Sequence, residues 1–270
     1  MAAGQTAGAR SLVSGEAIVV RNCCHLEEMR ACVALQKEVW NYSDAELVPL
    51  RMFVVAEKIG GQVIAAFDGE SEKMAGFALA IPGARAGRSY LHSQMLAVRK
   101  QYQNIGLGRR IKLFQREDGL TRGFDLIEWT FDPLEIKNAY LNIEKLGAIA
   151  RHYSVNQYGS SSSPLQGGLP TDRLVAEWWI RSKRVNDLLQ TGSKPEFEIL
   201  KTVSVPAQIY DWKASPATRD RAKSAQETNR QELQQAFAAG LSVLGYERSE
   251  HGDGKFLLGR WEENCTLSAD

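Results

Sequence analysis

The sequence has no run of apolar residues long enough to cross a membrane as a helix. Cysteine is scarce, and the four residues do not have the spacing of a zinc site: they are Cys23, Cys24, Cys32 and Cys265. No secretory signal is visible after Met1, and so few cysteines suit a reducing compartment. We therefore expect a cytoplasmic protein that binds no metal and whose cysteines serve as small apolar side chains.

An excess of charge of either sign is also missing. The 33 basic and 32 acidic side chains give a formal net charge of +1, so no overall potential draws the protein to nucleic acid. We expect neither a nucleic acid nor a membrane as a partner. Proline is scarce, at 8 of 270 residues, while six tryptophans and a hydrophobic fraction of 44% indicate a chain that buries a core.

The most informative feature present is a glycine turn, Q-N-I-G-L-G at residues 103–108, between a predicted strand at 90–98 and a predicted helix at 109–122. Such a turn leaves backbone N–H groups without partners at the helix start, and the helix dipole adds positive charge there. The two effects suit a phosphate or pyrophosphate, which glycine lets approach closely. A second predicted strand, 124–131, follows the helix and should run parallel to the first.

Two other phosphate-binding patterns do not fit this turn. A P-loop needs Gly-Lys-Ser or Gly-Lys-Thr after the glycines, and the chain has neither there. A dinucleotide fingerprint needs G-x-G-x-x-G, and the position of its third glycine is Ile111. An ordinary tight turn without a ligand remains the structural alternative.

The same segment resembles motif A of the GNAT superfamily, the acyl-CoA-dependent N-acyltransferases. That motif places a valine near the end of the fourth strand, here Val98, and Q/R-x-x-G-x-G/A five residues later, here 103–108. Residues 138–148, N-A-Y-L-N-I-E-K-L-G-A, resemble motif B, and W-T-F-D-P-L with a later W-W strand is similar to a bacterial GNAT subgroup. The resemblance covers roughly residues 15–159. It implies an α/β GNAT fold, with a mixed, mostly antiparallel sheet, flanking helices, and a parallel fourth and fifth strand that splay apart.

The resemblance also implies a cosubstrate, acetyl-CoA or another acyl-CoA, and the residues that hold it. Backbone groups around Leu96 and Val98 would hold pantetheine in the gap between the two strands. The loop and the start of motif B would hold the rest of CoA: Gln103, Asn104, Ile105, Gly106, Leu107, Gly108, Arg109 and Asn138. Arg99, Lys100, Arg109 and Arg110 are candidates for the outer phosphates.

Acyl transfer to an amine needs a base for the ammonium and an acid for the leaving thiolate. His92, on the strand beside the thioester, is the best base, because imidazole titrates near neutral pH. Glu128 and Asp132 are alternatives, although Asp132-Pro133 also suits a plain turn. For each, a structural role is the competing interpretation.

The expected acid departs from the family pattern. Many members carry tyrosine four residues before the glycine that ends motif B, and this chain has Ile143 there. Tyr140, on a neighbouring helical face, is our candidate, although it could be a packed aromatic residue. A thiolate with a pKa near 8–9 can also leave with little help.

We interpret the chain as an N-acyltransferase in which a small amine attacks the thioester directly, since no cysteine lies in either motif. One alternative is a non-catalytic acyl-CoA-binding or regulatory module. Another is nucleic-acid binding, without an aromatic platform, through a basic cluster. That cluster comprises Arg99, Lys100, Arg109, Arg110, Lys112 and Arg116.

The rest of the chain divides into a mobile tail at 1–15, the GNAT core at 16–159 and a C-terminal extension at 160–270 of strand, helix and hairpin. We expect the extension to cover the acceptor side or a homodimer face. Two roles are open for Trp40, Tyr42 and Phe53: they line the acceptor pocket, or they belong to the core. Two roles are also open for Arg173 and Arg181: they hold an acceptor carboxylate, or they lie in solvent. Further predicted elements are strands at 16–21, 62–67, 73–81, 148–158, 174–180 and 198–205, helices at 25–39, 48–59, 181–189 and 216–244, loops at 82–87 and 160–168, and a hairpin of 246–250 with 255–261.

Overall fold

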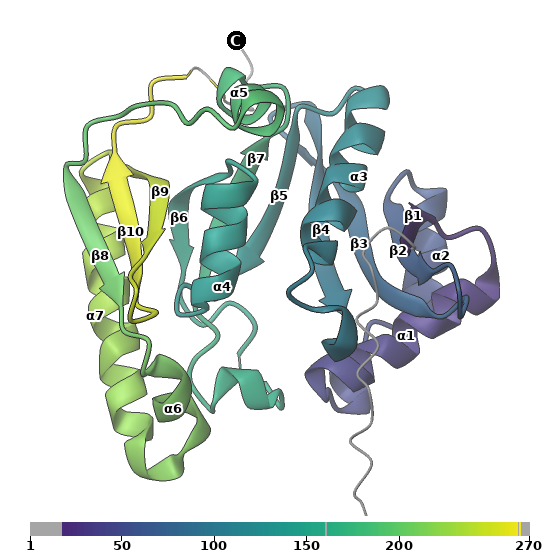
Figure 1. The fold of residues 1–270 in the computed structure, drawn as a ribbon, viewed down its shortest axis with the longest axis horizontal. Helices are drawn as coiled ribbons and strands as arrows, with labels where there is room; N and C mark the ends of the chain where they lie inside the picture. Colours follow the sequence, from purple (N-terminus) through teal and green to yellow (C-terminus); the bar gives the residue numbers. More distant parts are fainter. Residues whose placement is uncertain (1–17, 160, 264, 266–270) are drawn as a thin grey trace, which may run out of the picture.

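The computed structural model describes residues 18–159, 161–263 and 265, so the predicted tail at 1–15 lies outside the described residues. Ten strands form one sheet in the order β1-β2-β3-β4-β5-β7-β6-β9-β10-β8 (Figure 1). The strands are β1 (Ile18–Asn22), β2 (Gln62–Asp68), β3 (Met74–Arg85), β4 (Arg88–Val98), β5 (Leu126–Phe131), β6 (Ile149–Ser154), β7 (Arg173–Trp179), β8 (Lys201–Val205), β9 (Ser242–Arg248) and β10 (Gly254–Gly259).

Helices cover this sheet on both faces. They are α1 (Leu26–Trp40), α2 (Leu50–Lys58), α3 (Leu107–Thr121), α4 (Ile136–Ala139), α5 (Lys183–Thr191), α6 (Ile209–Ala214) and α7 (Arg219–Ala238). The helix α4 continues directly as a π-helix, Tyr140–Lys145. Short 3-10 turns lie at Asp44–Glu46, Lys100–Tyr102, Pro164–Gln166 and Pro216–Thr218.

The strand β2 and the first part of β3 are buried on both faces, because α1 and α2 cover one and α3 covers the other. Neighbouring residues of β2 show this: Ala65 packs in the cluster of α1 and α2, and Ile64 packs in the cluster of α3. Successive strand residues point to opposite faces, so a strand between two helical layers is apolar throughout. The sequences of β2 and β3, with V-I-A-A-F and A-G-F-A-L-A, meet that requirement.

The strands β4 and β5 are parallel, and they pair at only two positions, Leu91 with Ile127 and His92 with Glu128. After His92 no further residues of the two strands pair with each other. The pairing of β4 with β3 is also irregular between Ser93 and Met95. The predicted parallel pair that splays apart is confirmed. The separation leaves an opening in the middle of the sheet.

The strand β7 lies between β5 and β6 rather than beyond them. It carries Trp178 into the core, where the indole N–H donates to the Leu146 carbonyl at 2.7 Å and the ring meets Trp129 edge-on at 5.9 Å. Outside β6, the hairpin of β9 and β10 and then β8 continue the same sheet. The strands β7 to β10 therefore complete the sheet, and one of them, β7, enters its centre.

Two predicted segments are wrong. Residues 82–85 of the expected loop at 82–87 are strand, because Ala86 and Gly87 both have positive φ and close a two-residue turn that lets β3 extend to Arg85. The helix expected at 216–244 ends at Ala238, and Gly240, with φ 77°, turns the chain into β9. Residues 242–246 are buried in the strand β9, so the hairpin begins at Ser242 rather than 246.

Candidate active site

A cavity of about 450 Å³ occupies the opening between β4 and β5. Lys112 of α3 lines it from one face of the sheet, and Trp40 of α1 lines it from the other, so the cavity passes through the sheet. The second end is lined by residues between β6 and the start of β7: Tyr158, Ser161, Ser163, Leu165, Gln166, Thr171 and Arg173.

The loop before α3 presents free amides beside the first end of the cavity. Asn104 and Gly106 have φ of 64° and 81°, and the first helical bond runs from the Arg110 N–H to the Gly106 carbonyl at 3.1 Å. Within the described residues, no backbone carbonyl accepts from the N–H groups of 104–109. A Cβ at Gly106 would meet no atom within 4 Å, so space for a ligand remains above it. This arrangement fits a phosphate or pyrophosphate.

The other predicted CoA residues lie close to this loop. The side chain of Gln103 donates to the Val98 carbonyl at 2.9 Å and holds the loop against the end of β4. A Cβ on Gly108 would lie 3.7 Å from Leu96, which lines the cavity together with Asn138. The structure therefore brings the predicted strand, loop and motif B residues to one side of the opening.

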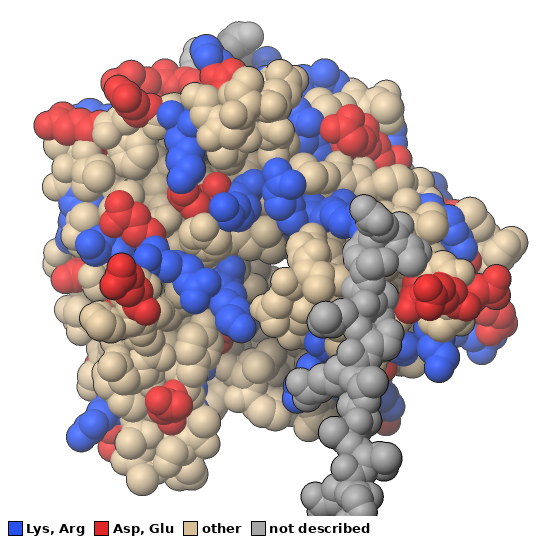
Figure 2. All heavy atoms as spheres, in the orientation of Figure 1, with Lys and Arg blue, Asp and Glu red and all other residues tan. Residues whose placement is uncertain are grey.

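Basic side chains gather around a hollow in the middle of the face that carries α3 (Figure 2). The six residues of the predicted basic cluster do not make one exposed patch, however. Lys112 and Arg116 are buried, Arg99 pairs with Glu38 at 3.0 Å, and Arg110 donates to the Ile18 carbonyl. This placement removes support for nucleic-acid binding through the cluster.

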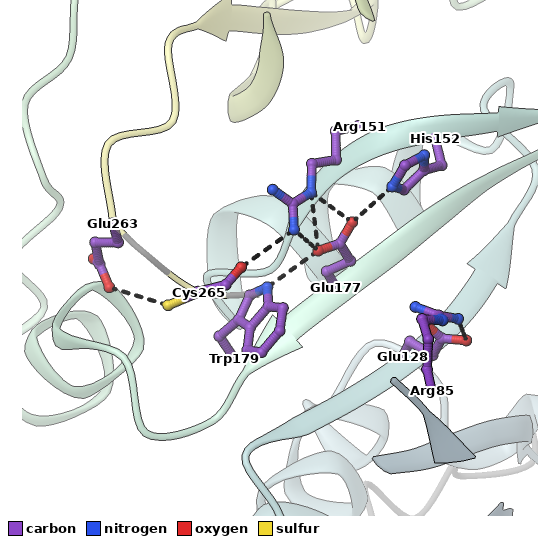
Figure 3. A network of polar contacts seen from close by, with 8 residues as sticks. All are labelled: Arg85, Glu128, Arg151, His152, Glu177, Trp179, Glu263 and Cys265. Atoms are coloured by element: carbon purple, nitrogen blue, oxygen red, sulfur yellow. Dashed lines mark hydrogen bonds and ion pairs between the residues drawn. The ribbon is translucent and has the colours of Figure 1, made fainter. Parts of the chain in front are cut away.

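His92 faces Glu128 where β4 and β5 still pair, with Nδ1 3.5 Å from Oε1. Arg85 holds the same carboxylate, its Nη2 lying 3.1 Å from both oxygens (Figure 3). Burial raises the pKa of Glu128, but the hydrogen bond from His92 and the charge of Arg85 outweigh it and lower the pKa overall. His92 does not line the cavity, whereas Ser93, the next residue, does.

Asp132 lines the cavity but is fully engaged by the protein. Its Oδ1 accepts from the Leu134 N–H at 2.8 Å, which is the turn expected as an alternative, and its Oδ2 accepts from Lys213 at 3.0 Å. Lys213 of α6 also donates to Glu135 at 2.9 Å. Burial lowers the pKa of Lys213, but the two carboxylates more than offset this and raise it.

Tyr140 faces away from the opening. Its ring lies 5.1 Å from Lys145 Nζ and 5.8 Å from the Arg248 guanidinium, and it lines a separate cavity beside β9 and β10. Ile143, at the position of the usual tyrosine, is in the core. The geometry thus gives no support to Tyr140 as the acid for a thiolate in the opening.

Lys112 is a cavity-lining residue that our sequence analysis placed wrongly, in a surface cluster. It is 2% exposed, and its Nζ donates to Ser93 Oγ at 2.8 Å and to Gln115 Oε1 at 3.1 Å. The same Nζ lies 3.7 Å from the centre of the Trp129 ring. Burial lowers its pKa well below 10.5. Its place beside Ile111 on the inward side of α3 was the available signal, but lysine in a charged helix is normally exposed.

The fold was compared with known proteins. No protein-family model matches the sequence, and no curated protein matches it either. Similar solved structures include ribosomal-protein-S5-alanine acetyltransferase from Vibrio fischeri, with a TM-score of 0.51 and 16% identity over 63% of this chain and 96% of the other. A GNAT-family acetyltransferase from Streptococcus pneumoniae has a TM-score of 0.48 and 15% sequence identity, over 59% of this chain and 98% of the other. Ribosomal-protein-S18-alanine N-acetyltransferase from Escherichia coli has a TM-score of 0.48 and 16% sequence identity, over 61% of this chain and 95% of the other.

The chain has the GNAT fold. The splayed parallel pair and the helix-start loop are where the resemblance placed them. In this GNAT fold, no described helix has both the length and the apolar character needed to cross a membrane. Among the same residues, no three His, Cys, Asp or Glu side chains are grouped to hold a metal ion.

The second end of the cavity in this GNAT fold carries aromatic side chains and one arginine. The rings of Trp40 and Tyr42 lie 5.4 Å apart, and the Arg173 guanidinium lies 5.6 Å from the ring of Tyr158. Arg173 donates to the Asp172 carbonyl at 2.8 Å, and no described carboxylate forms an ion pair with it. The arrangement can accept a small molecule that carries an anionic group.

Two other candidates for the acceptor pocket lie elsewhere. Phe53 is completely buried and packs edge-on against Phe77 in the core, so it does not line the cavity. Arg181 pairs with Asp125 at 3.0 Å, also outside the cavity. Only Trp40, Tyr42 and Arg173 of the proposed acceptor residues reach the opening.

Proposed function

We propose that the protein is an N-acyltransferase that moves an acyl group, by default acetyl, from acyl-CoA to a small amine. The observation that carries this proposal is the cavity through the sheet, with unpaired amides beside one end and polar and aromatic side chains at the other. Two reactants that enter from opposite faces would meet in the opening between β4 and β5. Holding them there supplies much of the catalysis that an activated thioester needs.

The donor end would be held by the chain's own backbone. The N–H groups of residues 104–109 would bind the pyrophosphate, and Arg109, whose Nε lies 3.4 Å from the Lys145 carbonyl, is placed beside them. Backbone groups of β4 that β5 leaves unpaired would hold pantetheine near Leu96, with Asn138 on the facing wall. Acyl-CoA supplies the activated thioester.

His92 is the base in this proposal. Glu128, fixed by Arg85, would orient the imidazole through Nδ1 and leave Nε2 to receive the proton of the amine, directly or through a water. Asp132 is the weaker candidate, because Lys213 and the Leu134 amide already occupy its oxygens. The amine attacks the thioester itself, since the described residues that line the cavity include no cysteine.

The test has two stages. Calorimetry with acetyl-, succinyl- and longer acyl-CoA should show heat of binding, and a thiol-release assay with pools of small amines, amino acids included, should then show CoA release. Absence of binding to every CoA species by a folded protein would overturn the proposal. Binding without thiol release for any amine would instead support a non-catalytic acyl-CoA-binding module, an outcome that the buried Ile143 makes worth testing.

A further inference from the structure

Lys112 is a buried lysine that has no acidic partner. An ammonium has three N–H donors, and here Ser93 Oγ, Gln115 Oε1 and the face of Trp129 receive them. No carboxylate among the described residues is within ion-pair distance of Nζ, and burial is the sole cause of its lowered pKa. A lone buried ammonium is costly, so a lysine at this place needs an explanation other than stability.

Ser93 stands between this lysine and the cavity. Its Oγ accepts a hydrogen bond from Lys112 at 2.8 Å, which leaves its own O–H available as a donor. No described residue accepts from that hydroxyl, and Ser93 lines the cavity on β4, next to the separation from β5. The hydroxyl can therefore donate to a group inside the cavity.

The proposed reaction lacks a proton donor at the place where the family pattern puts one. Ile143 cannot donate, and Tyr140 lines a different cavity. The other charged groups that line the opening are Glu46, Asp132, Glu135 and Arg173. Asp132 and Glu135 are engaged by Lys213, and no hydrogen bond or ion pair among the described residues joins any of the four to Ser93 or Lys112.

We propose that Ser93, supported by Lys112, is the catalytic acid that protonates the sulfur of CoA as the thioester breaks. This inference rests on the proposed function. As the C–S bond breaks, the Ser93 hydroxyl gives its proton to the sulfur, and Lys112 gives one to the Ser93 oxygen. Lys112 is left neutral and takes up a proton from solvent before the next cycle, while the proton of the attacking amine leaves through the base.

The electrostatics of the pair suit this transfer. A lysine whose pKa is lowered by burial gives up a proton more readily than an exposed lysine. The positive charge behind Ser93 also favours negative charge on the sulfur before the proton arrives.

The experiment measures the thiol of bound CoA and needs no acceptor. The ultraviolet absorbance of the thiolate is followed against pH for free CoA and for CoA bound to the full protein, with desulfo-CoA as the spectral blank. We expect binding to move the midpoint to lower pH by about one to three pH units. Ser93→Ala and Lys112→Met should each remove most of that shift while calorimetry still detects CoA binding.

The control is Lys183→Met, which removes an exposed lysine paired with Asp187 on α5 and should leave the shift intact. A wild-type midpoint equal to that of free CoA, or a shift that survives in both variants, would overturn the role of the pair. An acyl ester on Ser93 in acid-quenched protein would overturn it too, because Ser93 would then be a nucleophile. Failure of every CoA species to bind would instead remove the proposed function.

Discussion

Glu128 of β5 and Glu177 of β7 occupy directly opposed positions of neighbouring antiparallel strands. Both are buried, and each has its own arginine and histidine: Arg85 and His92 for Glu128, Arg151 and His152 for Glu177. Figure 3 shows both glutamates with their arginines, and His152 beside Glu177. Arg151 reaches Glu177 at 2.8 Å, and the Trp179 indole adds a bond at 3.1 Å. Like charges opposed across strands destabilise a sheet, so the two arginines make this pair tolerable.

The first prediction concerns acid stability. Because the folded-state pKa of Glu128 lies below its ordinary value, its ionised form stabilises the fold above that value. The stability is lost as the pH falls through the folded-state pKa. Glu128→Gln should reduce the free energy of unfolding at pH 7 by about 1–3 kcal/mol and make its decline in acid shallower.

Urea unfolding between neutral pH and the acid limit of the native state measures both effects. The control is Glu57→Gln, since Glu57 is exposed on α2 and should change neither quantity. An equally steep decline in acid for Glu128→Gln and the wild type would show that Glu128 does not contribute to it.

The second prediction concerns the attachment of α6 to the cavity wall. Lys213→Met leaves the buried Asp132 and the half-buried Glu135 without their cation, so we expect a loss of about 3–5 kcal/mol. Adding Asp132→Asn should restore part of this, because the uncompensated charge is then removed. Thermal unfolding measures the loss, and Lys255→Met, at an exposed pair with Glu247, should have little effect. If Lys213→Met left the thermal stability unchanged, solvent would have to reach the two carboxylates.

The sequence was sufficient where the determinants are local. The loop at 103–108 was recognised because positive φ at Gly106 and a helix start are properties of a few adjacent residues. The parallel β4 and β5 followed from a strand, a helix and a strand in succession. The residues 241–246 show the limit, since a short apolar run suits a helix or a strand equally and only packing decides.

Other features depend on contacts far apart in the chain. The place of β7 between β5 and β6 comes from pairings with both neighbours, which no local pattern encodes. The charged neighbours of Lys112 along α3 predict a surface cluster. In the fold, however, Ser93 of β4 and Trp129 of β5 enclose Lys112. The place of Asp132 after β5 suits a base, and only the fold shows that Lys213, 81 residues later, holds its carboxylate.

The third prediction tests His92 as the base. His92→Ala should lower turnover by about 100-fold or more, as is typical for loss of a general base. It should also flatten the rise in rate between about pH 6 and 8 that an imidazole base produces, because only the neutral ring accepts a proton. The measurement is the pH dependence of thiol release with an acceptor found in the screen.

A matched control exists on β6. His152 also lies 3.5 Å from a buried glutamate, Glu177, but it is on β6, whereas His92 is next to Ser93 of the cavity wall, so His152→Ala should keep both the rate and the shape of the profile. An unchanged profile for His92→Ala would exclude His92 as the base, and a similar change in both variants would indicate a general effect on the sheet.

The fourth prediction separates binding at the loop from stability, using two glycines at opposite ends of α3. Gly106 and Gly123 have φ of 81° and 80°, and a Cβ at either would meet no atom within 4 Å. Alanine at each position therefore costs about the same backbone strain, about 1–2 kcal/mol, and should lower thermal stability equally. Gly106→Ala should in addition weaken acetyl-CoA binding at least tenfold in calorimetry, since the loop amides lose their alignment, while Gly123→Ala keeps wild-type affinity. Equal affinity of the two variants would place the pyrophosphate somewhere other than the start of α3.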